Sequence, residues 1–195
     1  MKKLRLAPII AAALIFAACN GNTDTSTTDT DSTTNTMSSD NNNMNADTTN
    51  NGTSSDVADF AKDAATGGMM EVKLGDIAQK NGADAAVKNF GKMMVEDHSK
   101  LNDEFKALAA RKNITLPTSV TDDQQSDIDK LSKETGTDFD KDYVSMMVDD
   151  HQKDIDEFKD ARDKINDADI KDFINNALPV LEKHLNAIKQ IKKID

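Results

Sequence analysis

Apolar residues recur every three to four positions over long stretches of this chain, and that spacing limits the fold more than any other feature. It is the period of an amphipathic α-helix, and the alternation that marks a β-strand is missing. Four long helices are expected: Asp56 to Lys80, Asp84 to Lys112, a third that starts after Thr137 and a fourth that starts after Asp167. Residues 57–195 are therefore expected to form one all-α domain, a four-helix bundle.

The connection between the second and third long helices is longer than the other two. It has about 24 residues, from 113 to 136. Within it, Thr121 and Gln124 have the spacing of a capping box, which predicts a short extra helix from Asp122 to Lys133, ended by Gly136. A connection of this length can cross the bundle, which is the ferritin-like arrangement, and a simple up-down bundle is the alternative.

Three further features predict where the long helices begin and end. Asp56 is expected to cap the start of the first helix, and Asn81-Gly82 is expected to end it. Thr137 and Asp140 have the spacing of a second capping box, which is expected to start the third long helix.

Residues 1–18 have the pattern of a secretory signal peptide. Three basic residues within the first five positions precede an apolar run from Leu6 to Ala18, which is shorter than the ~20 residues needed to span a bilayer. The segment Phe16-Ala-Ala-Cys19 resembles a lipobox, so we expect cleavage before Cys19 and lipidation of its thiol. A plain signal peptide that leaves Cys19 free is the alternative, but lipidation accounts better for a single Cys, which has no disulfide partner in the chain.

Residues 19–56 are expected to be the lipidated Cys19 followed by a disordered polar tether. Of the 37 residues from Asn20 to Asp56, 32 are Asn, Thr, Ser or Asp, and none is basic or aromatic. Such a segment cannot bury enough apolar surface to offset the entropy lost on ordering. We therefore expect an exported protein, lipid-anchored to the cell envelope at the outer membrane or the periplasmic face, with the tether as a spacer.

The charge of the chain excludes some partners. Removing residues 1–18 takes away three positive charges and no negative ones, so the formal net charge goes from −11 to −14. Such an acidic protein is not expected to bind nucleic acid, which needs a basic surface. Nor is a basic membrane-surface helix expected, so contact with the membrane is assigned to the lipid anchor.

The second and third long helices contain an internal repeat. Phe90 to Lys106 aligns with Tyr143 to Lys159 without a gap, and ten of the 17 positions are identical. These two helices are therefore expected to present the same side chains inward at the same spacing.

Four short motifs together resemble an uncharacterised family, domain of unknown function 4142, which is described as ferritin-like. The motifs are Glu71-Val-Lys-Leu-Gly, Met93-Met-Val-Glu-Asp-His98, Tyr143-Val-Ser-Met-Met-Val-Asp-Asp-His151 and Leu178-Pro-Val-Leu-Glu-Lys-His184. The resemblance covers Val57 to Lys192. It implies the fold and an exported, often lipidated protein, and it implies no activity.

Each long helix has one polar residue on its apolar stripe: Glu71, His98, His151 and His184. Each lies near the middle of its helix, so all four can meet at one level of the core. One Glu and three His suit one Zn(II), non-haem iron or Cu(II) ion, and bundle-core metal sites are built from facing helices in this way. The other interpretation is a structural cluster of hydrogen-bonded Glu and His.

The ligand pattern of ferritin-type di-iron sites is not present. Those sites need a Glu three residues before a His, and the residues at that offset are Val95, Val148 and Leu181. Asp97 and Asp150 adjoin their own His residues but point about 100° away around the helix, so they are expected to be neighbours of the cluster rather than its ligands.

Met94 and Met147 lie one turn before His98 and His151 on the same faces. Thioether and imidazole together suit Cu(I), but methionines also fill irregular gaps in cores, which is the interpretation we favour.

No Ser-His-Asp order, Gly-rich phosphate loop or Cys nucleophile points to an enzyme. Two functions are left: a binding, structural or stress-protective envelope lipoprotein, and a protein that binds Zn, Fe or Cu.

Overall fold

The computed structural model describes residues 54–191. The expected signal peptide, Cys19 and nearly all of the expected tether lie outside the described residues. The described part contains five helices: α1 (Ser55–Asn81), α2 (Ala85–Lys112), α3 (Asp122–Leu131), α4 (Gly136–Lys164) and α5 (Ala168–Ile191). No β-strand occurs between residues 54 and 191, so the all-α prediction is confirmed.

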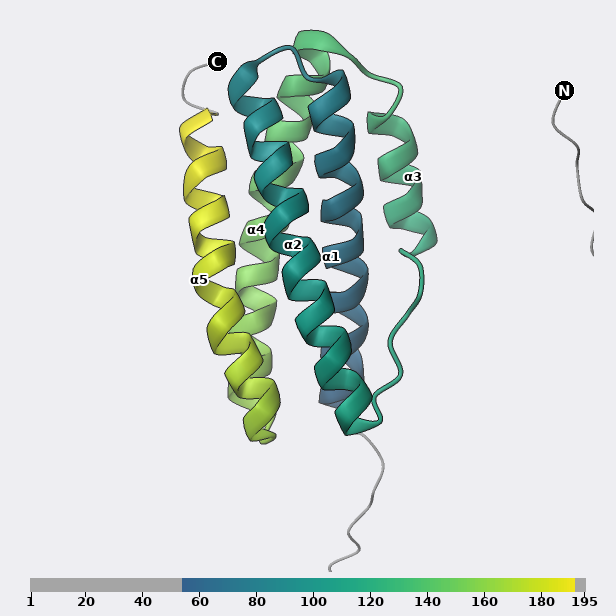
Figure 1. The fold of residues 1–195 in the computed structure, drawn as a ribbon, viewed down its shortest axis with the longest axis vertical. Helices are drawn as coiled ribbons and strands as arrows, with labels where there is room; N and C mark the ends of the chain where they lie inside the picture. The colour runs from purple at the N-terminus through teal and green to yellow at the C-terminus, as the bar shows by residue number, and fades with distance from the viewer. Residues whose placement is uncertain (1–53, 192–195) are drawn as a thin grey trace, which may run out of the picture. The chain divides into compact units, whose positions relative to one another are not determined.

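The four long helices pack in a ring (Figure 1). α1 contacts α2 and α4, α5 contacts the same two helices, and α3 lies outside the ring against α1. This packing agrees with the expected bundle. Its interior is apolar, with fully buried side chains from every long helix, among them Leu74, Met94, Phe139, Met147 and Ile174.

The connection that contains α3 runs the length of the bundle (Figure 1). As a result, α2 and α4 begin at the same end. The buried carboxylate of Asp140 in α4 accepts hydrogen bonds from the backbone N–H groups of Ala83 (3.0 and 3.2 Å) and Asp84 (2.8 Å), just before α2. The long connection therefore crosses the bundle, so that α2 and α4 run in the same direction, which a simple up-down bundle does not allow.

The capping box of the short helix is confirmed, whereas the expected cap of α1 is wrong. The Thr121 hydroxyl accepts a hydrogen bond from the Gln124 backbone N–H, and the Gln124 side chain accepts one from the Thr121 N–H. In α1, Ser54 is the cap, because its hydroxyl accepts a hydrogen bond from the Val57 N–H at 3.3 Å. Asp56 lies inside the first turn, where its negative charge interacts favourably with the positive end of the helix dipole.

Two predictions about the start of α4 are wrong. Thr137 and Asp140 do not form a capping box, because the Asp140 carboxylate bonds to the backbone before α2 instead. Gly136 does not end the short helix, which already stops at Leu131. Gly136 is the first residue of α4 and has φ +70°, a conformation that glycine adopts without steric cost.

Two glycines let α1 and α2 approach closely. A Cβ added at Gly75 would lie 2.6 Å from the Gly91 carbonyl oxygen, and one added at Gly91 would lie 2.7 Å from the Gly75 carbonyl oxygen. Both obstacles are backbone atoms, so a side chain at either position would force the helices apart. Because Glu71 lies one turn before Gly75, this approach also brings its carboxylate close to α2.

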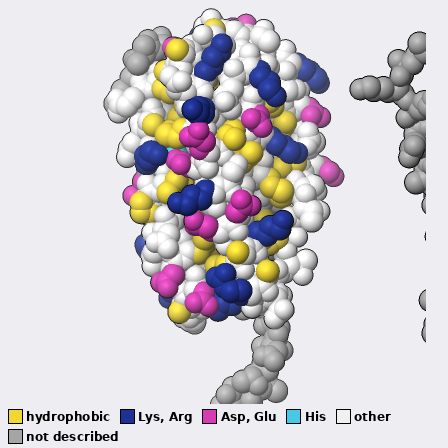
Figure 2. Space-filling view, in the orientation of Figure 1, with side chains coloured by type: hydrophobic (Ala, Val, Ile, Leu, Met, Phe, Trp, Pro, Cys, Tyr) yellow, Lys and Arg dark blue, Asp and Glu magenta, His cyan; other side chains and the backbone are white. Residues whose placement is uncertain are grey.

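The visible surface of the bundle is highly charged. Basic and acidic side chains are interspersed over the face shown in Figure 2. None of the described helices is both long enough and apolar enough to cross a membrane.

Candidate metal centre

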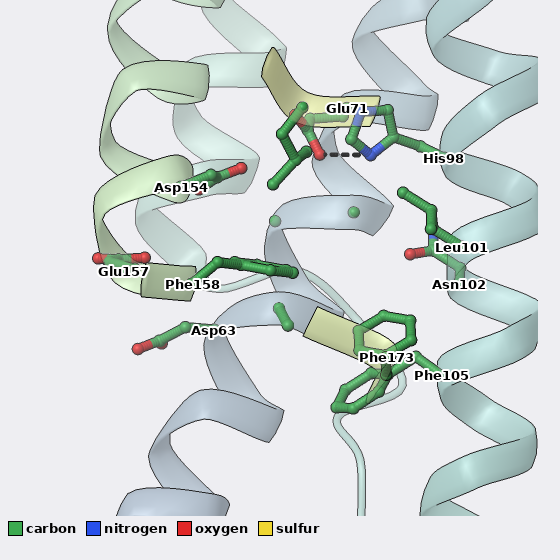
Figure 3. A pocket seen from close by; sticks show the side chains of 14 residues that line it. Asp63, Glu71, His98, Leu101, Asn102, Phe105, Asp154, Glu157, Phe158 and Phe173 are labelled. Atoms are coloured by element: carbon green, nitrogen blue, oxygen red, sulfur yellow. Dashed lines mark ion pairs between the residues drawn. The ribbon is translucent and has the colours of Figure 1, made fainter. Parts of the chain in front are cut away.

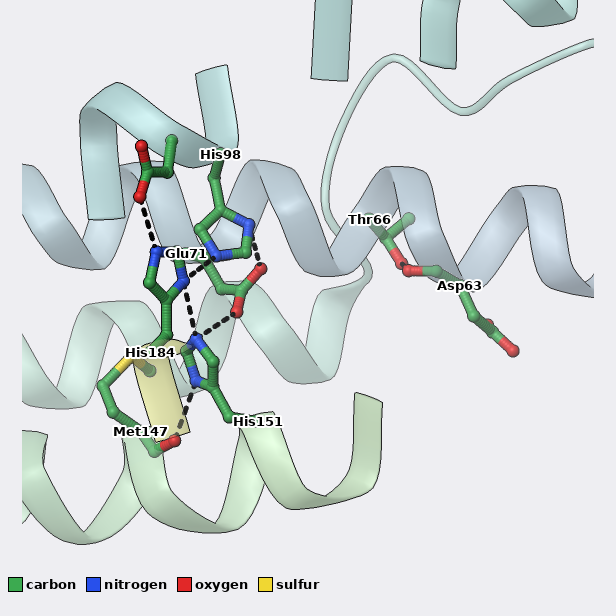
Figure 4. Close-up of polar contacts among 8 residues, drawn as sticks. Asp63, Thr66, Glu71, His98, Met147, His151 and His184 are labelled. Carbon is green, nitrogen blue, oxygen red and sulfur yellow. Dashed lines mark hydrogen bonds and ion pairs between the residues drawn. The ribbon is translucent and has the colours of Figure 1, made fainter. Parts of the chain in front are cut away.

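The four polar residues of the apolar stripes meet in the middle of the bundle (Figure 4). Glu71 comes from α1, His98 from α2, His151 from α4 and His184 from α5. Their exposed fractions are 1%, 2%, 0% and 0%. The prediction that these residues are buried and share one level of the core is confirmed.

One ring nitrogen of each histidine faces a common centre. His184 Nδ1 lies 3.2 Å from His98 Nε2 and 3.4 Å from His151 Nε2. Glu71 Oε1 lies 3.4 Å from His151 Nε2. Four ligands at the ~2.0–2.1 Å typical of zinc–nitrogen bonds, arranged tetrahedrally, are separated by about 3.3 Å. The inner nitrogens of the three histidines all lie within 4.8 Å of one another, which is close to this spacing, whereas Glu71 groups by the same distance with Asp150 and Asp154.

The other ring nitrogen of each histidine contacts an acceptor. His151 Nδ1 lies 2.9 Å from the Met147 backbone carbonyl oxygen, and His184 Nε2 lies 2.8 Å from Asp97 Oδ2. A carbonyl oxygen can only accept, so Nδ1 of His151 carries the proton. The ionised Asp97 carboxylate fixes the proton of His184 on Nε2 in the same way.

The third histidine completes this pattern. His98 Nδ1 lies 2.8 Å from Glu71 Oε2. Metal-binding histidines usually donate their second N–H to a carboxylate or a carbonyl, which orients the ring and raises its basicity. All three histidines of the cluster have such a partner on the outer side.

Burial keeps the three imidazoles neutral. Desolvation lowers the pKa of His98 to about 4, although the nearby carboxylates oppose the shift. Desolvation and the other two histidines lower the pKa of His151 to about 3. Desolvation also lowers the pKa of His184 to about 4, in spite of its hydrogen bond to Asp97. A neutral ring has one proton, so the inner nitrogens of His151 and His184 both hold lone pairs and cannot bond to each other.

Glu71 is the carboxylate at the centre of the cluster. Its Oε1 atom is buried and has no hydrogen-bond partner. His151 Nε2 lies 3.4 Å from Oε1, but the proton of this ring is on Nδ1, so Nε2 cannot donate to Oε1. Burial raises the pKa of Glu71 well above its ordinary value, and the neighbouring Asp150 carboxylate adds to the rise. This environment favours either a proton or a cation beside Oε1.

Asp97 and Asp150 lie beside the cluster, as expected, but each in a different role. Asp97 accepts its hydrogen bond from His184 across the bundle rather than from its sequence neighbour, and Lys183 Nζ lies 3.0 Å from the same oxygen. Although partial burial opposes the shift, these two hydrogen bonds lower the pKa of Asp97. Asp150 instead faces Glu71 and Asp154, within 4.8 Å of both through one oxygen of each residue.

Asp154 is the residue of this site that sequence reasoning missed. It lies three positions after His151, hence one turn further along the same face of α4. The internal repeat could have revealed it, because Asp154 aligns with the apolar Leu101 of α2. An acidic residue at a position where the repeat has an apolar one indicates a special role. The di-iron pattern places its ligand three residues before a histidine, whereas Asp154 follows its histidine by the same spacing.

Met94 and Met147 are both fully buried in the core. The contact that Met147 makes with the cluster is through its backbone carbonyl. The ring of Phe90 lies edge-on to His151 and His184, with centroids 6.2 Å from both. The cluster is therefore closed on one side by an aromatic residue.

The lowered pKa values of the histidines predict an acid-sensitive metal-free protein. Unfolded histidines bind protons at the ordinary pKa of 6.5, whereas the buried ones stay neutral down to pH of about 3 to 4. Between these limits the unfolded state binds more protons, so the free energy of unfolding should decrease as the pH falls. The raised pKa values of the neighbouring carboxyls act in the opposite direction, because those groups bind protons in the folded state first.

His151→Gln isolates the histidine contribution. The slope of the free energy of unfolding against pH, between pH 4 and 6.5, should decrease by about 1.4 kcal/mol per pH unit, the value for one proton. Urea unfolding in the presence of a chelator, at steps of half a pH unit, measures this slope. Equal slopes for the variant and the parent protein would show that His151 titrates normally in the fold.

Comparisons with known proteins agree with the resemblance seen in the motifs. A search of curated proteins and a search of solved structures each gave no match. A family model matches residues 42–191, which is most of the chain and includes all four residues of the cluster. The chain therefore belongs to the family described as Domain of unknown function (DUF4142).

Proposed function

We propose that this protein holds one first-row transition-metal ion in its bundle core, with Glu71, His98, His151 and His184 as ligands. The observation that carries the proposal is the pair of inner nitrogens on His151 and His184, 3.4 Å apart, neither of which has a proton to donate. Two lone pairs at this distance repel each other unless a positive charge lies between them.

A single proton does not satisfy the cluster. If Glu71 Oε2 holds a proton and donates it to His98 Nδ1, His98 Nε2 can donate to His184 Nδ1. This arrangement leaves His151 Nε2 and Glu71 Oε1 without a donor. A metal ion among the inner nitrogens of the three histidines would serve all of these lone pairs, and Glu71 Oε1, 3.4 Å from His151 Nε2, would complete its ligands. Binding should then release the Glu71 proton, since metal ligands bind in their deprotonated form.

The donor set favours a borderline divalent ion. Three neutral imidazoles and one carboxylate suit Zn(II), and Cu(II) and Fe(II) are the competitors that this set also accepts. Four protein ligands fill a tetrahedral shell and leave no position for a substrate, which is the mark of a structural or storage site rather than a catalytic one. The burial of all four residues supports holding of the ion rather than turnover at it.

The competing function is a structural bundle whose Glu and His residues bond only to one another. Metal content decides between the two. Protein produced without an affinity tag and dialysed without chelator should contain close to one Zn, Fe or Cu per chain by mass spectrometry, and His184→Gln should contain much less. Metal-free protein that also fails to take up Zn(II), Cu(II) or Fe(II) would leave the structural function.

We further propose that the bundle is ferritin-like in its connectivity, although its ligands differ from a di-iron site. Support comes from the crossover connection between α2 and α4. The positions that a di-iron motif would fill with Glu are occupied by Val95, Val148 and Leu181.

The proposed address is the cell envelope, with the bundle tethered through a lipid on Cys19. The basic start, the apolar run and the lipobox-like segment support this proposal. In cells, the precursor should be cleaved before Cys19, and the mature protein should separate with the membranes. Cys19→Ser should accumulate as a longer, uncleaved precursor without lipid. Normal processing of this variant, together with unchanged membrane association, would contradict the lipoprotein assignment.

A further inference from the structure

Beside the histidines lies a second group of potential ligands, made only of oxygen atoms. Glu71, Asp150 and Asp154 each have one carboxylate oxygen within 4.8 Å of the others. Glu71 is 1% exposed, and its Oε1 atom has no hydrogen-bond partner. Asp150 Oδ2 is also buried without a partner. Two of the three carboxylates in this group therefore have a buried oxygen without a hydrogen-bond partner.

The neutral ring of His98 lies 2.8 Å from Glu71 and does not compensate the charge of these carboxylates. In the range 54–191, neither Lys nor Arg forms an ion pair with Glu71, Asp150 or Asp154. The closest candidate by position, Lys153, instead pairs with Glu157 at 3.0 Å on the surface. Three carboxylates this close together repel one another, and leaving buried charge uncompensated is costly. A cation would remove the repulsion.

A small cavity provides the space for a cation. It has a volume of about 30 Å³, and its lining includes Glu71, His98 and Asp154, while Asp150 lies outside the lining (Figure 3). A site needs only about 10–15 Å³ to hold one water-sized occupant. The cavity exists partly because Gly67 has no side chain, since a Cβ there would lie 3.9 Å from Asp154 Oδ2.

The small and apolar residues around the cavity are less buried than the rest of the core. Four of them are only half buried: Ala64, Gly67, Leu101 and Phe158. The core is therefore less tightly packed near Glu71 than it would be in a uniformly packed bundle.

We propose that Glu71, Asp150 and Asp154 bind a second divalent cation of the hard class, such as Mn(II), Mg(II) or Ca(II), so that Glu71 bridges it to the histidine centre. Oxygen-only ligand sets select these ions, whereas the histidine set selects Zn(II) or its competitors. The two sites are thus chemically distinct.

This inference goes beyond the proposed function and shares only Glu71 with it. The test uses the full chain, first loaded with one equivalent of Zn(II) and then titrated with Mn(II). Free Mn(II) is counted from its electron paramagnetic resonance signal. We expect one Mn(II) per chain in the parent protein. Asp154→Asn should weaken Mn(II) binding by at least about tenfold, because the site loses a charged ligand, while Zn(II) uptake stays at one per chain.

Two further variants make the result decisive. Asp150→Asn should also weaken Mn(II) binding. Because two separate variants are tested, a folding defect in one of them does not decide the outcome. Asp149→Asn makes the same charge change at an exposed position of α4 and should bind Mn(II) as the parent does. Mn(II) binding that is absent from the parent, or unchanged in both Asp150→Asn and Asp154→Asn, would overturn the second site. Uptake of Zn(II) without Mn(II) refutes this inference alone, and uptake of Mn(II) without Zn(II) refutes the histidine centre alone.

Discussion

Zn(II) added in about a hundredfold excess over its dissociation constant should raise the thermal unfolding midpoint of chelator-treated protein by roughly 10 °C. The reason is linkage, because a ligand that binds only the folded state adds about 2.7 kcal/mol to the free energy of unfolding at that excess. For a domain of this size, each kcal/mol moves the midpoint by about 3–4 °C. The four inner atoms belong to four different helices, so an ion among them ties the whole bundle together.

Single substitutions at the cluster should abolish most of this gain. Glu71→Gln, His98→Gln and His184→Gln each remove or weaken one ligand. Asp97→Asn should have a smaller effect, since it removes only the outer partner of His184, and such partners are typically worth about 10- to 100-fold in metal affinity. The melts are repeated with Cu(I), Cu(II) and Fe(II).

The outcome of these melts separates the two functions. A midpoint that does not respond to any of the metals would end the metal-binding proposal and leave a structural polar core. A shift that survives all the substitutions would place the ion elsewhere, on the acidic surface. In metal-free protein, Glu71→Ala should still lower the free energy of unfolding by on the order of 1–3 kcal/mol, because His98 loses its partner.

Gly91→Ala should be among the most destabilising small changes available in this protein. Its new Cβ would meet the Gly75 carbonyl oxygen at 2.7 Å and the Ala78 Cβ at 2.8 Å. Neither atom can move without shifting α1, and overpacking of this kind costs about 1–3 kcal/mol. Gly75→Ala should behave in the same way, because its Cβ would lie 2.6 Å from the Gly91 carbonyl oxygen.

Gly67→Ala is the matched control in α1. The nearest atom to its added Cβ is Asp154 Oδ2 at 3.9 Å, so the space is open. Alanine also has the higher helix propensity, and we expect this variant to gain about 0.5–1 kcal/mol. Urea unfolding at constant m-value measures all three variants. Equal stabilities for Gly67→Ala and Gly91→Ala would show that α1 and α2 do not pack as described.

The glycine pair also connects the fold to the site. Pushing α1 away from α2 moves Glu71, one turn from Gly75, away from His98, to which it is now 2.8 Å distant. Zn(II) affinity should therefore fall in Gly75→Ala, although this residue touches no ligand. A Zn(II) affinity equal to that of the parent would show that Glu71 does not depend on this close approach.

The sequence alone determined the helices and the inward position of the cluster. Helical periodicity depends on the angle between successive side chains, a local property of the backbone, so residue spacing identifies which face of a helix is apolar. A polar residue on that face must be buried with the face. This is why residue spacing is enough to identify Glu71, His98, His151 and His184. The long connection allowed a crossover without excluding a simple up-down bundle, and the structure decided between the two.

Only the tertiary structure decided which atoms face one another. The rotation and axial shift between two helices follow from packing, such as the seating of Gly75 on Gly91, and residue spacing does not contain them. Asp97 therefore bonds to His184 on α5 rather than to its sequence neighbour, and Asp140 bonds to the backbone before α2 instead of capping α4. Asp154 belongs to the site for the same reason. It lies one turn from His151, and it reaches Glu71 because α1, with the small Gly67, packs opposite.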